Sequence, residues 1–208
     1  MLHPLNFTLM TFKRKHLLLR SEIVGPLHGV ITTVAHCRLI ANSDNPISSL
    51  PRAEGARFNS RLRQDESGCL EQTRVEVLED IASWVENAKT GAPWMFVIQG
   101  LAGTGKSTIA HTVCNMFTER GWLGASFFFS RNEATCSDPF MVFTTIAYQL
   151  ASRYPNFRSC LTDVLKADPD IVGLTLEMQL EKLVIEPFRV AVDIIGALPV
   201  VVVVDALD

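Results

Sequence analysis

The sequence lacks an apolar run long enough to cross a membrane. Its longest apolar stretch, residues 194–204, is interrupted by Gly196 and Pro199, whereas a spanning helix needs roughly 20 apolar residues. We therefore expect no membrane span. Apolar residues make up 48% of the 208-residue chain and charged residues 20%. That composition favours a folded globular protein over a disordered or fibrous one, and the length fits one domain with an appendage.

Cysteine is scarce and follows no metal-binding or disulfide pattern. The five cysteines are odd in number, widely spaced and include no C-x-x-C pair. A disulfide framework or a zinc site would need such pairing, so we expect neither. The simplest location is then a reducing compartment, and we expect the protein to be cytoplasmic. The cysteines are Cys37, Cys69, Cys114, Cys136 and Cys160.

The main part of the chain also lacks an excess of basic charge. Up to residue 68 there are nine basic and five acidic residues, but residues 69–208 carry seventeen acidic and ten basic ones. Binding to a nucleic-acid backbone needs a basic surface. The balance therefore argues against DNA or RNA as the main ligand.

Residues 1–68 show no sustained helical or strand period. Short apolar stretches alternate with a basic cluster at 13–16 and a segment rich in Pro, Ser and Asn at 42–51. We predict a poorly ordered N-terminal extension over 1–68, or an incorrectly assigned gene start, followed by one folded domain over 69–208. A targeting peptide is the alternative, although an Arg-rich and Ser-rich amphipathic pattern is not evident.

Helical and strand patterns alternate from residue 69 onward. Apolar residues at helical spacing predict a first helix over 71–89, with Thr73 as its N-cap. An apolar strand is predicted over 95–99, and a glycine-rich loop and a helix over 107–119 follow it; Gly121 closes this helix. Three consecutive Phe in the strand predicted at 125–129 suggest burial on both of its faces.

The second half of the domain continues this alternation. Asp138 and Pro139 predict the N-terminus of a helix whose buried face begins at Phe140. Further helices are predicted over 157–166 and 176–195, with Pro187 starting, kinking or splitting the second. Five consecutive Val at 200–204 predict a central parallel strand. The predicted fold class is α/β, with helices on both faces of a parallel sheet in three layers.

One loop carries the strongest functional signal. Residues 100–107 match the phosphate-loop pattern G-x-x-x-x-G-K-[ST] at every fixed position, directly between a predicted strand and a predicted helix. Glycines at 100, 103 and 105 allow backbone conformations that direct N–H groups toward a phosphate at the helix N-terminus. Lys106 is expected to reach the β- and γ-oxygens, and the Ser107 hydroxyl to ligate Mg²⁺.

A second signal lies at the end of the last predicted strand. Asp205 directly follows the five Val residues, and the carboxyl ends of parallel strands form the edge where ligands bind in open α/β folds. Its carboxylate is therefore expected to hold Mg²⁺ together with the phosphate loop.

Five segments resemble a known family. GLAGTGKST at 100–108, LGASFFFSR at 123–131, AYQLA at 147–151, DPDIV at 168–172 and VDALD at 204–208 are similar to the NACHT domain of the STAND P-loop NTPases. The similarity is to its fungal form, the nephrocystin-like N-terminal domain. The resemblance covers 69–208 and includes the Thr73-Arg74 pair before the first helix.

The resemblance implies a P-loop NTPase domain with a three-layer α/β/α fold. It also implies binding of ATP or GTP with Mg²⁺, slow hydrolysis, and nucleotide-gated oligomerisation with signalling partners. By this resemblance, Thr73 and Arg74 lie where related proteins contact the base. The implied site residues are Gly100, Gly103, Thr104, Gly105, Lys106, Ser107 and Thr108 for the nucleotide, Ser107 and Asp205 for the metal, and Lys106, Asp205 and Asp208 for catalysis.

The resemblance also implies parts that are not in this sequence. The family's D-A-L-D-E pattern continues with a Glu, which would be residue 209, and with a later strand and a winged helix. We therefore expect an incomplete domain with a gap in its sheet and impaired hydrolysis. A non-hydrolysing nucleotide-binding scaffold is the alternative function. A small-molecule kinase would need an Arg-rich lid, and no such cluster is present in the sequence.

Overall fold

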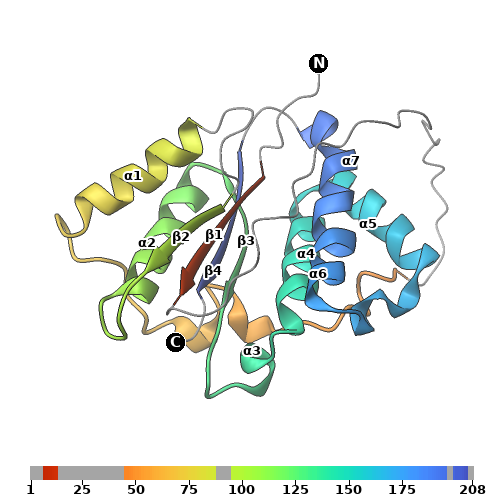
Figure 1. The fold of residues 1–208 in the computed structure, drawn as a ribbon, viewed down its shortest axis with the longest axis horizontal. Helices are drawn as coiled ribbons and strands as arrows, with labels where there is room; N and C mark the ends of the chain where they lie inside the picture. Colours follow the sequence, from red (N-terminus) through yellow and green to blue (C-terminus); the bar gives the residue numbers. More distant parts are fainter. Residues whose placement is uncertain (1–6, 14–44, 88–94, 196–198, 206–208) are drawn as a thin grey trace.

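The computed structural model describes residues 7–13, 45–87, 95–195 and 199–205. These residues form a mixed α/β unit in which a small, four-stranded parallel sheet is flanked by helices on both faces (Figure 1). The strands are β1 (Phe7–Lys13), β2 (Met95–Gln99), β3 (Leu123–Phe128) and β4 (Val200–Asp205). The α-helices are α1 (Val75–Glu86), α2 (Lys106–Glu119), α3 (Ala134–Ser137), α4 (Met141–Arg153), α5 (Pro155–Ala167), α6 (Leu176–Gln179) and α7 (Glu186–Ile195). Shorter helical segments are η1 (Glu54–Ala56), η2 (Arg61–Arg63), η3 (Pro169–Gly173) and η4 (Leu180–Ile185).

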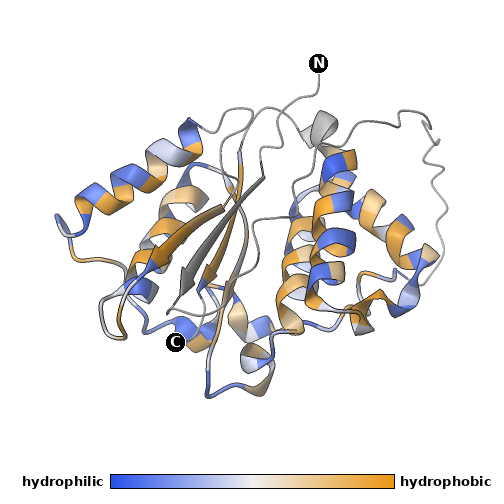
Figure 2. Ribbon diagram, in the orientation of Figure 1, coloured by the Kyte–Doolittle hydropathy of each residue, from blue (hydrophilic) through white to orange (hydrophobic). Residues whose placement is uncertain are grey.

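The sheet buries both faces of its valine-rich strand. Alternate residues of β4 contact opposite sides: Val200 and Val202 pack in a cluster with α4, α5 and α7, whereas Val201 and Val203 pack with α1 and α2. This is why the strand reads as a continuous apolar run. Figure 2 shows the same division, because the apolar residues of the helices gather where helices meet the strands or one another. The predicted strands at 95–99, 125–129 and 200–204 are confirmed as β2, β3 and β4 within one or two residues.

Strand β1 occupies the position in the sheet that we expected to be empty. The strand order is β2-β1-β4-β3, and β1 pairs in parallel with both of its neighbours. Its Met10 lies in register with Phe96 of β2 and Val203 of β4. The predicted gap is therefore wrong for the described residues. The segment FTLMTFK is rich in residues that favour strands, but it is too short to stand out as a period.

Residues 45–68 are also part of the folded unit. Ile47, Leu50, Ala53 and Ala56 are buried in the cluster that contains α4 and the inner side of β3. The backbone N–H of Ala53 donates to the Thr145 hydroxyl on α4 at 2.9 Å. Here the structure differs from the loosely ordered extension that we predicted, because scattered aliphatic and alanine side chains fill the space beside α4 without any helical period.

Two predicted helix starts are wrong in detail. Thr73 does not cap α1, since its hydroxyl donates to the Leu70 carbonyl at 2.7 Å. The N-cap residue is Arg74, in a left-handed conformation with φ of 59°. Asp138 accepts a hydrogen bond from the Phe140 N–H at 2.9 Å, but α4 begins only at Met141. Phe140 is 48% exposed, so it lies outside the buried face on which we placed it.

The prediction that Pro187 interrupts the last long helix is confirmed. Proline has no N–H to give to the carbonyl four residues earlier. In the turn before it, η4 adopts a π-helical conformation in which the Glu186 N–H bonds the Glu181 carbonyl, five residues back. The helical stretch is thereby divided into α6, η4 and α7.

A buried glutamine covers the outer edge of β3. The Gln149 amide accepts from the Ser126 N–H at 3.1 Å and donates to the Ser126 carbonyl at 2.8 Å. An unpaired strand edge invites pairing with other chains. This side chain from α4 therefore satisfies backbone groups at the middle of β3, next to the strand that carries the candidate site.

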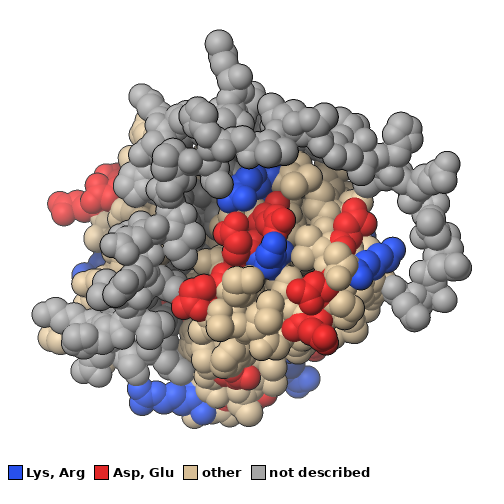
Figure 3. All heavy atoms as spheres, turned by 45° about the vertical axis from the view of Figure 1, so that its right-hand side comes forward, with Lys and Arg blue, Asp and Glu red and all other residues tan. Residues whose placement is uncertain are grey.

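Charges of both signs share the surface on the side of α5 and α7. Figure 3 shows acidic and basic side chains interspersed on this face. Lys182 pairs with Glu186 at 2.9 Å, and Arg189 with Glu181 at 3.6 Å.

A membrane-spanning helix was not expected, and no described helix combines the length and apolarity that a bilayer span requires.

Candidate functional site

The two sequence signals meet at one edge of the sheet. Residues 100–107, here called the glycine-rich loop, follow the carboxyl end of β2 and lead into α2. Asp205 is the last residue of β4, which runs parallel to β2 with β1 between them. Parallel strands end at the same edge, so the loop and Asp205 lie on the side where open α/β sheets bind ligands.

The glycine-rich loop has the backbone that its sequence predicts at two of three glycines. Gly103 and Gly105 have φ angles of +78° and +85°, a region that residues with a Cβ rarely adopt. Gly100 does not have a positive φ, but a Cβ there would lie 2.9 Å from the Thr104 hydroxyl oxygen. It is therefore close approach that requires glycine at position 100.

The Lys106 amine lies inside the curve of this loop. Its Nζ donates to the carbonyls of Gly100 and Leu101, each at 3.0 Å, and the residue is only 7% exposed. Lys106 is the first residue of α2, with Gly105 as the N-cap. A cation is thus held at the positive end of a helix, where anions are favoured.

Asp205 is buried beside Ser107. Asp205 is 6% exposed. Burial raises the pKa of Asp205 to about 6, and the hydrogen bond from Ser107 works against this rise. The charges of Arg63 and Lys106 also lower the pKa, whereas Glu66 raises it. The carboxyl group therefore changes its charge near neutral pH.

This pKa predicts that stability depends on pH through Asp205. A carboxyl whose pKa is higher in the folded protein than its ordinary 3.8 favours folding below pH 3.8 and loses that contribution as pH rises through about 6. Two pKa units correspond to roughly 2.7 kcal/mol, and the raised pKa already includes the opposing effect of the Ser107 bond. We expect Asp205→Asn to gain about 2–3 kcal/mol of unfolding free energy over the wild type as the pH rises from 4 to 8.

Urea unfolding of both proteins at several pH values measures this difference. The gain should develop between pH 4 and pH 7 and then level off. A constant difference across that range would show that Asp205 does not titrate there.

A hollow of about 430 Å³ opens beside the glycine-rich loop. Gly105 and Thr108 line it from the loop side, and Thr73 and Arg74 line it from the turn before α1, together with residues 67–70. The Arg74 guanidinium donates to the Thr104 carbonyl at 3.0 Å, so the turn and the loop are tied together. The predicted nucleotide residues Gly105 and Thr108 therefore lie next to this hollow.

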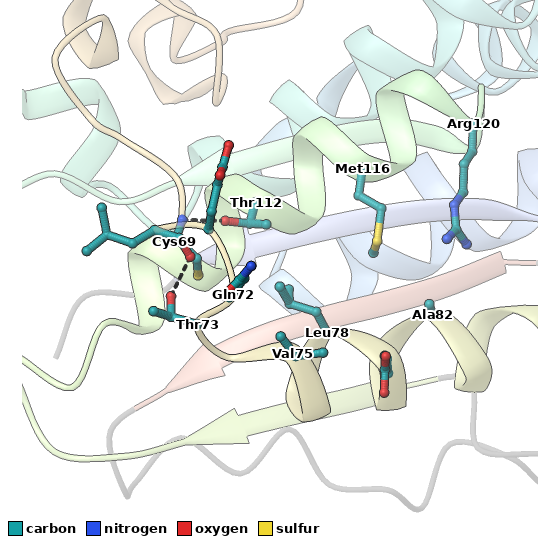
Figure 4. A pocket seen from close by; sticks show the side chains of 12 residues that line it. Cys69, Gln72, Thr73, Val75, Leu78, Ala82, Thr112, Met116 and Arg120 are labelled. Atoms are coloured by element: carbon teal, nitrogen blue, oxygen red, sulfur yellow. Dashed lines mark hydrogen bonds between the residues drawn. The ribbon is translucent and has the colours of Figure 1, made fainter.

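An adjoining groove of about 310 Å³ runs between α1 and α2. Figure 4 shows its lining, in which Val75, Leu78 and Ala82 of α1 lie opposite Met116 of α2. The Thr112 hydroxyl on α2 accepts a hydrogen bond from the Cys69 N–H at 2.7 Å. That bond attaches the turn before α1 to the helix that follows the glycine-rich loop.

Sequence reasoning missed a polar cluster behind the site. Nη1 of the buried Arg63 donates to both carboxylate oxygens of Glu66, Oε1 at 2.9 Å and Oε2 at 3.1 Å. Glu66 Oε2 also lies 2.5 Å from His111 Nε2. His111 lies on α2, and the residues near it in the sequence do not point to a partner for its side chain. In the sequence, Arg63 and Glu66 form an ordinary i,i+3 charge pair. No local pattern shows that Glu66 contacts His111 of α2, which lies 45 positions later in the chain.

The structure thus brings together most of the predicted site. Lys106, Ser107 and Asp205 lie at one sheet edge, whereas Asp208 lies outside the described residues. Arg131 follows β3 and is exposed. No group of three or more His, Cys, Asp or Glu that could hold a metal occurs in the described part of the chain.

Comparison with known proteins identifies the family. The family model described as "Nephrocystin 3, N-terminal" matches residues 73–208, which include the glycine-rich loop and β4. No curated protein and no solved structure matches the chain. Because the matched region is well over half of the chain, it is sufficient to assign the family. The chain belongs to the nephrocystin 3 N-terminal family.

Proposed function

We propose that this chain binds a nucleoside triphosphate, ATP or GTP, together with Mg²⁺, as a NACHT-type P-loop NTPase domain. The observation that carries the proposal is that the glycine-rich loop, with Lys106 at the start of α2, and the buried Asp205 lie at the same edge of the sheet. Ser107 comes from the loop after β2 and Asp205 from the end of β4, almost one hundred residues later. A hydroxyl and a carboxylate held together at a helix N-terminus, next to a buried lysine, form the donor set of a magnesium phosphate site.

The side chains fit magnesium better than a metal with a complete protein cage. Mg²⁺ prefers oxygen ligands and commonly takes one or two from the protein, with the rest from phosphates and water. Ser107 and Asp205 offer two such oxygen donors. When bound, Mg²⁺ would neutralise charge on the β- and γ-phosphate oxygens.

Each residue of the loop then has a defined role toward the phosphates. Gly103 and Gly105 give the loop its left-handed turns, so that backbone N–H groups can approach an anion. The Lys106 amine, which donates to the carbonyls of Gly100 and Leu101, exchanges these neutral acceptors for charged phosphate oxygens. Such charge-assisted hydrogen bonds are about twice as strong as neutral ones.

The hollow beside the loop is suited to the nucleoside. It adjoins Gly105 and Thr108, where the phosphates would lie, and extends to Thr73 and Arg74. We infer that the base and ribose lie against this turn. Contacts to phosphate and metal do not select a base, so discrimination between ATP and GTP would arise here.

Hydrolysis separates two forms of the proposal. A signalling switch would hydrolyse the triphosphate slowly, with Lys106, Asp205 and Asp208 in catalytic roles, and would act in the cytoplasm with oligomerisation or signalling partners. A non-hydrolysing scaffold would bind nucleotide without turnover. One observation favours the scaffold: within the described residues Glu66 is the acidic side chain whose charge acts on Asp205, and it is engaged by Arg63 and His111.

Calorimetric titration with ATP and GTP, with and without Mg²⁺, tests the proposal. We expect the wild type to bind more tightly with Mg²⁺, and Ser107→Ala to lose roughly 10-fold of that enhancement, because one of two protein ligands is removed. Without Mg²⁺ the variant should bind nearly as the wild type does.

Ser152→Ala is the matched control, since Ser152 is an exposed hydroxyl on α4 that donates to the Tyr148 carbonyl. It should leave binding unchanged. Equal binding by Ser107→Ala and the wild type at all Mg²⁺ concentrations would overturn the metal assignment.

A further inference from the structure

The cluster of Arg63, Glu66 and His111, here called the brace, lies behind the candidate site. Arg63 belongs to η2 and is 7% exposed, and its guanidinium lies over the Phe128 ring at 5.0 Å. The brace precedes the matched family region at residue 73 in two of its three members. Its connections reach both halves of the candidate site.

One arm of the brace reaches the backbone of Asp205. Arg63 Nη2 donates to the Phe128 carbonyl at 2.7 Å and to the Phe129 carbonyl at 3.2 Å. The peptide group that joins these two residues also donates its N–H, from Phe129, to the Asp205 carbonyl at 2.9 Å. Arg63 therefore fixes one end of a peptide whose other end bonds the backbone of the candidate metal ligand.

The other arm reaches the helix that begins with Lys106 and Ser107. Arg63 Nη1 binds Glu66, and Glu66 contacts His111 on the second turn of α2. Ser107 at the start of α2 in turn lies beside the Asp205 side chain. The contacts thus form a closed ring that runs from Asp205 through the brace and α2 back to Asp205.

Stability alone is a poor explanation for such a cluster. Arg63 Nε is buried and has no hydrogen-bond partner, and an unpaired buried polar atom costs free energy. The Glu66 side chain is 41% exposed, and ion pairs with a partner this exposed usually contribute about 1 kcal/mol or less. The ring offers another reason for the cluster, since it couples the position of Asp205 to that of α2.

We propose that Arg63 and Glu66 are positioning residues of the phosphate site, which hold the end of β4 and the start of α2 at the spacing that a magnesium triphosphate requires. This inference rests on the proposed function. A metal held by only two protein ligands depends on their separation, so neighbours that fix this separation should affect metal-dependent binding more than binding of the bare nucleotide. The residues before the family match would then contribute directly to the site.

The test compares nucleotide affinity with and without Mg²⁺ for Arg63→Met, Arg63→Lys and Glu66→Gln in the full chain. We expect Arg63→Met to reduce the Mg²⁺-dependent enhancement roughly 10-fold to 100-fold, as removal of an outer-shell partner does, with a much smaller change without Mg²⁺. Arg63→Lys keeps the charge but cannot bond Glu66 and the two carbonyls at the same time. Its Mg²⁺-dependent enhancement should therefore lie between those of Arg63→Met and the wild type. Glu66→Gln should fall between Arg63→Lys and Arg63→Met.

Arg52→Met is the control, because Arg52 lies in the same segment, stacks on Tyr148 at 4.3 Å and pairs with Glu54 on the surface. It should leave the Mg²⁺ enhancement intact. Equal loss of affinity with and without Mg²⁺ in Arg63→Lys and Glu66→Gln, or a lower melting temperature with an unchanged enhancement, would overturn the positioning role. If Arg63→Met does not fold, these two milder variants decide. Absence of an Mg²⁺ enhancement in the wild type would instead overturn the proposed function, and the positioning role with it.

Discussion

Replacing Lys106 by Ala should lower the affinity for ATP at least about 100-fold, since a charge-assisted hydrogen bond contributes roughly 1.5–3 kcal/mol and one lysine can reach more than one phosphate oxygen. The amine is already confined within the loop by the Gly100 and Leu101 carbonyls, at 3.0 Å each. Little entropy is therefore lost when it transfers to phosphate. Titration calorimetry with ATP and Mg²⁺ measures the change.

A nucleoside monophosphate makes this experiment specific to the loop. Lys106 is assigned to the β- and γ-oxygens, which a monophosphate does not have, so its weaker affinity should change by less than a few fold. Lys182→Ala is the control, because Lys182 is a half-exposed lysine that pairs with Glu186. Unchanged ATP affinity in Lys106→Ala would contradict the site assignment, and an equal loss for monophosphate and triphosphate would point to a collapsed loop.

Local chemistry in the sequence was sufficient to predict the center of the site. The glycine-rich loop combines three constraints within eight residues, namely two left-handed glycines, a lysine and a hydroxyl, and each has an independent physical reason. Asp205 was predictable because it ends a strand buried on both faces. Where residue type and strand position determine the geometry, the sequence therefore predicts where these residues lie in the fold.

The supporting residues could not be predicted in the same way. Arg63 and His111 are separated by 48 positions, and the peptide that Arg63 bonds belongs to a third segment. Hydrogen bonds of this kind depend on how whole elements pack, and they leave no period or motif in the chain. The left-handed conformation of Arg74 is similar, because the cap position depends on the turn that Thr112 attaches to α2.

The strand order shows a different limit. Each of β2, β3 and β4 is apolar enough to be recognised singly, but their order depends on long-range pairing. We predicted no strand between β2 and β4 from local patterns, although the segment FTLMTFK has residue types that favour a strand and forms β1 at this position. The irregular pattern of residues 1–68 as a whole gave no indication of this seven-residue strand.

A proline in β1 should destabilise the folded protein by at least about 3 kcal/mol, since a buried carbonyl that loses its partner costs roughly 1–3 kcal/mol and the ring also disturbs the adjoining strand. Met10 is at the middle of β1 and lies in register with both neighbouring strands. Met10→Pro removes a backbone N–H there, whereas Met10→Val keeps it and suits a strand. Urea unfolding should show the large loss only for proline.

The same variant also tests the candidate site, because β1 determines how far apart its halves lie. β2 and β4 are each paired with β1, so the axes of the two strands that carry the loop and Asp205 are separated by two strand spacings, roughly 9.6 Å. If β1 leaves the sheet, β2 and β4 must separate or pair directly, and either change moves Asp205 relative to Ser107 by several ångströms. Met10→Pro should therefore lose Mg²⁺-dependent nucleotide binding even at temperatures where it remains folded. A variant with wild-type stability and binding would show that residues 7–13 are the loosely attached extension that the sequence first suggested.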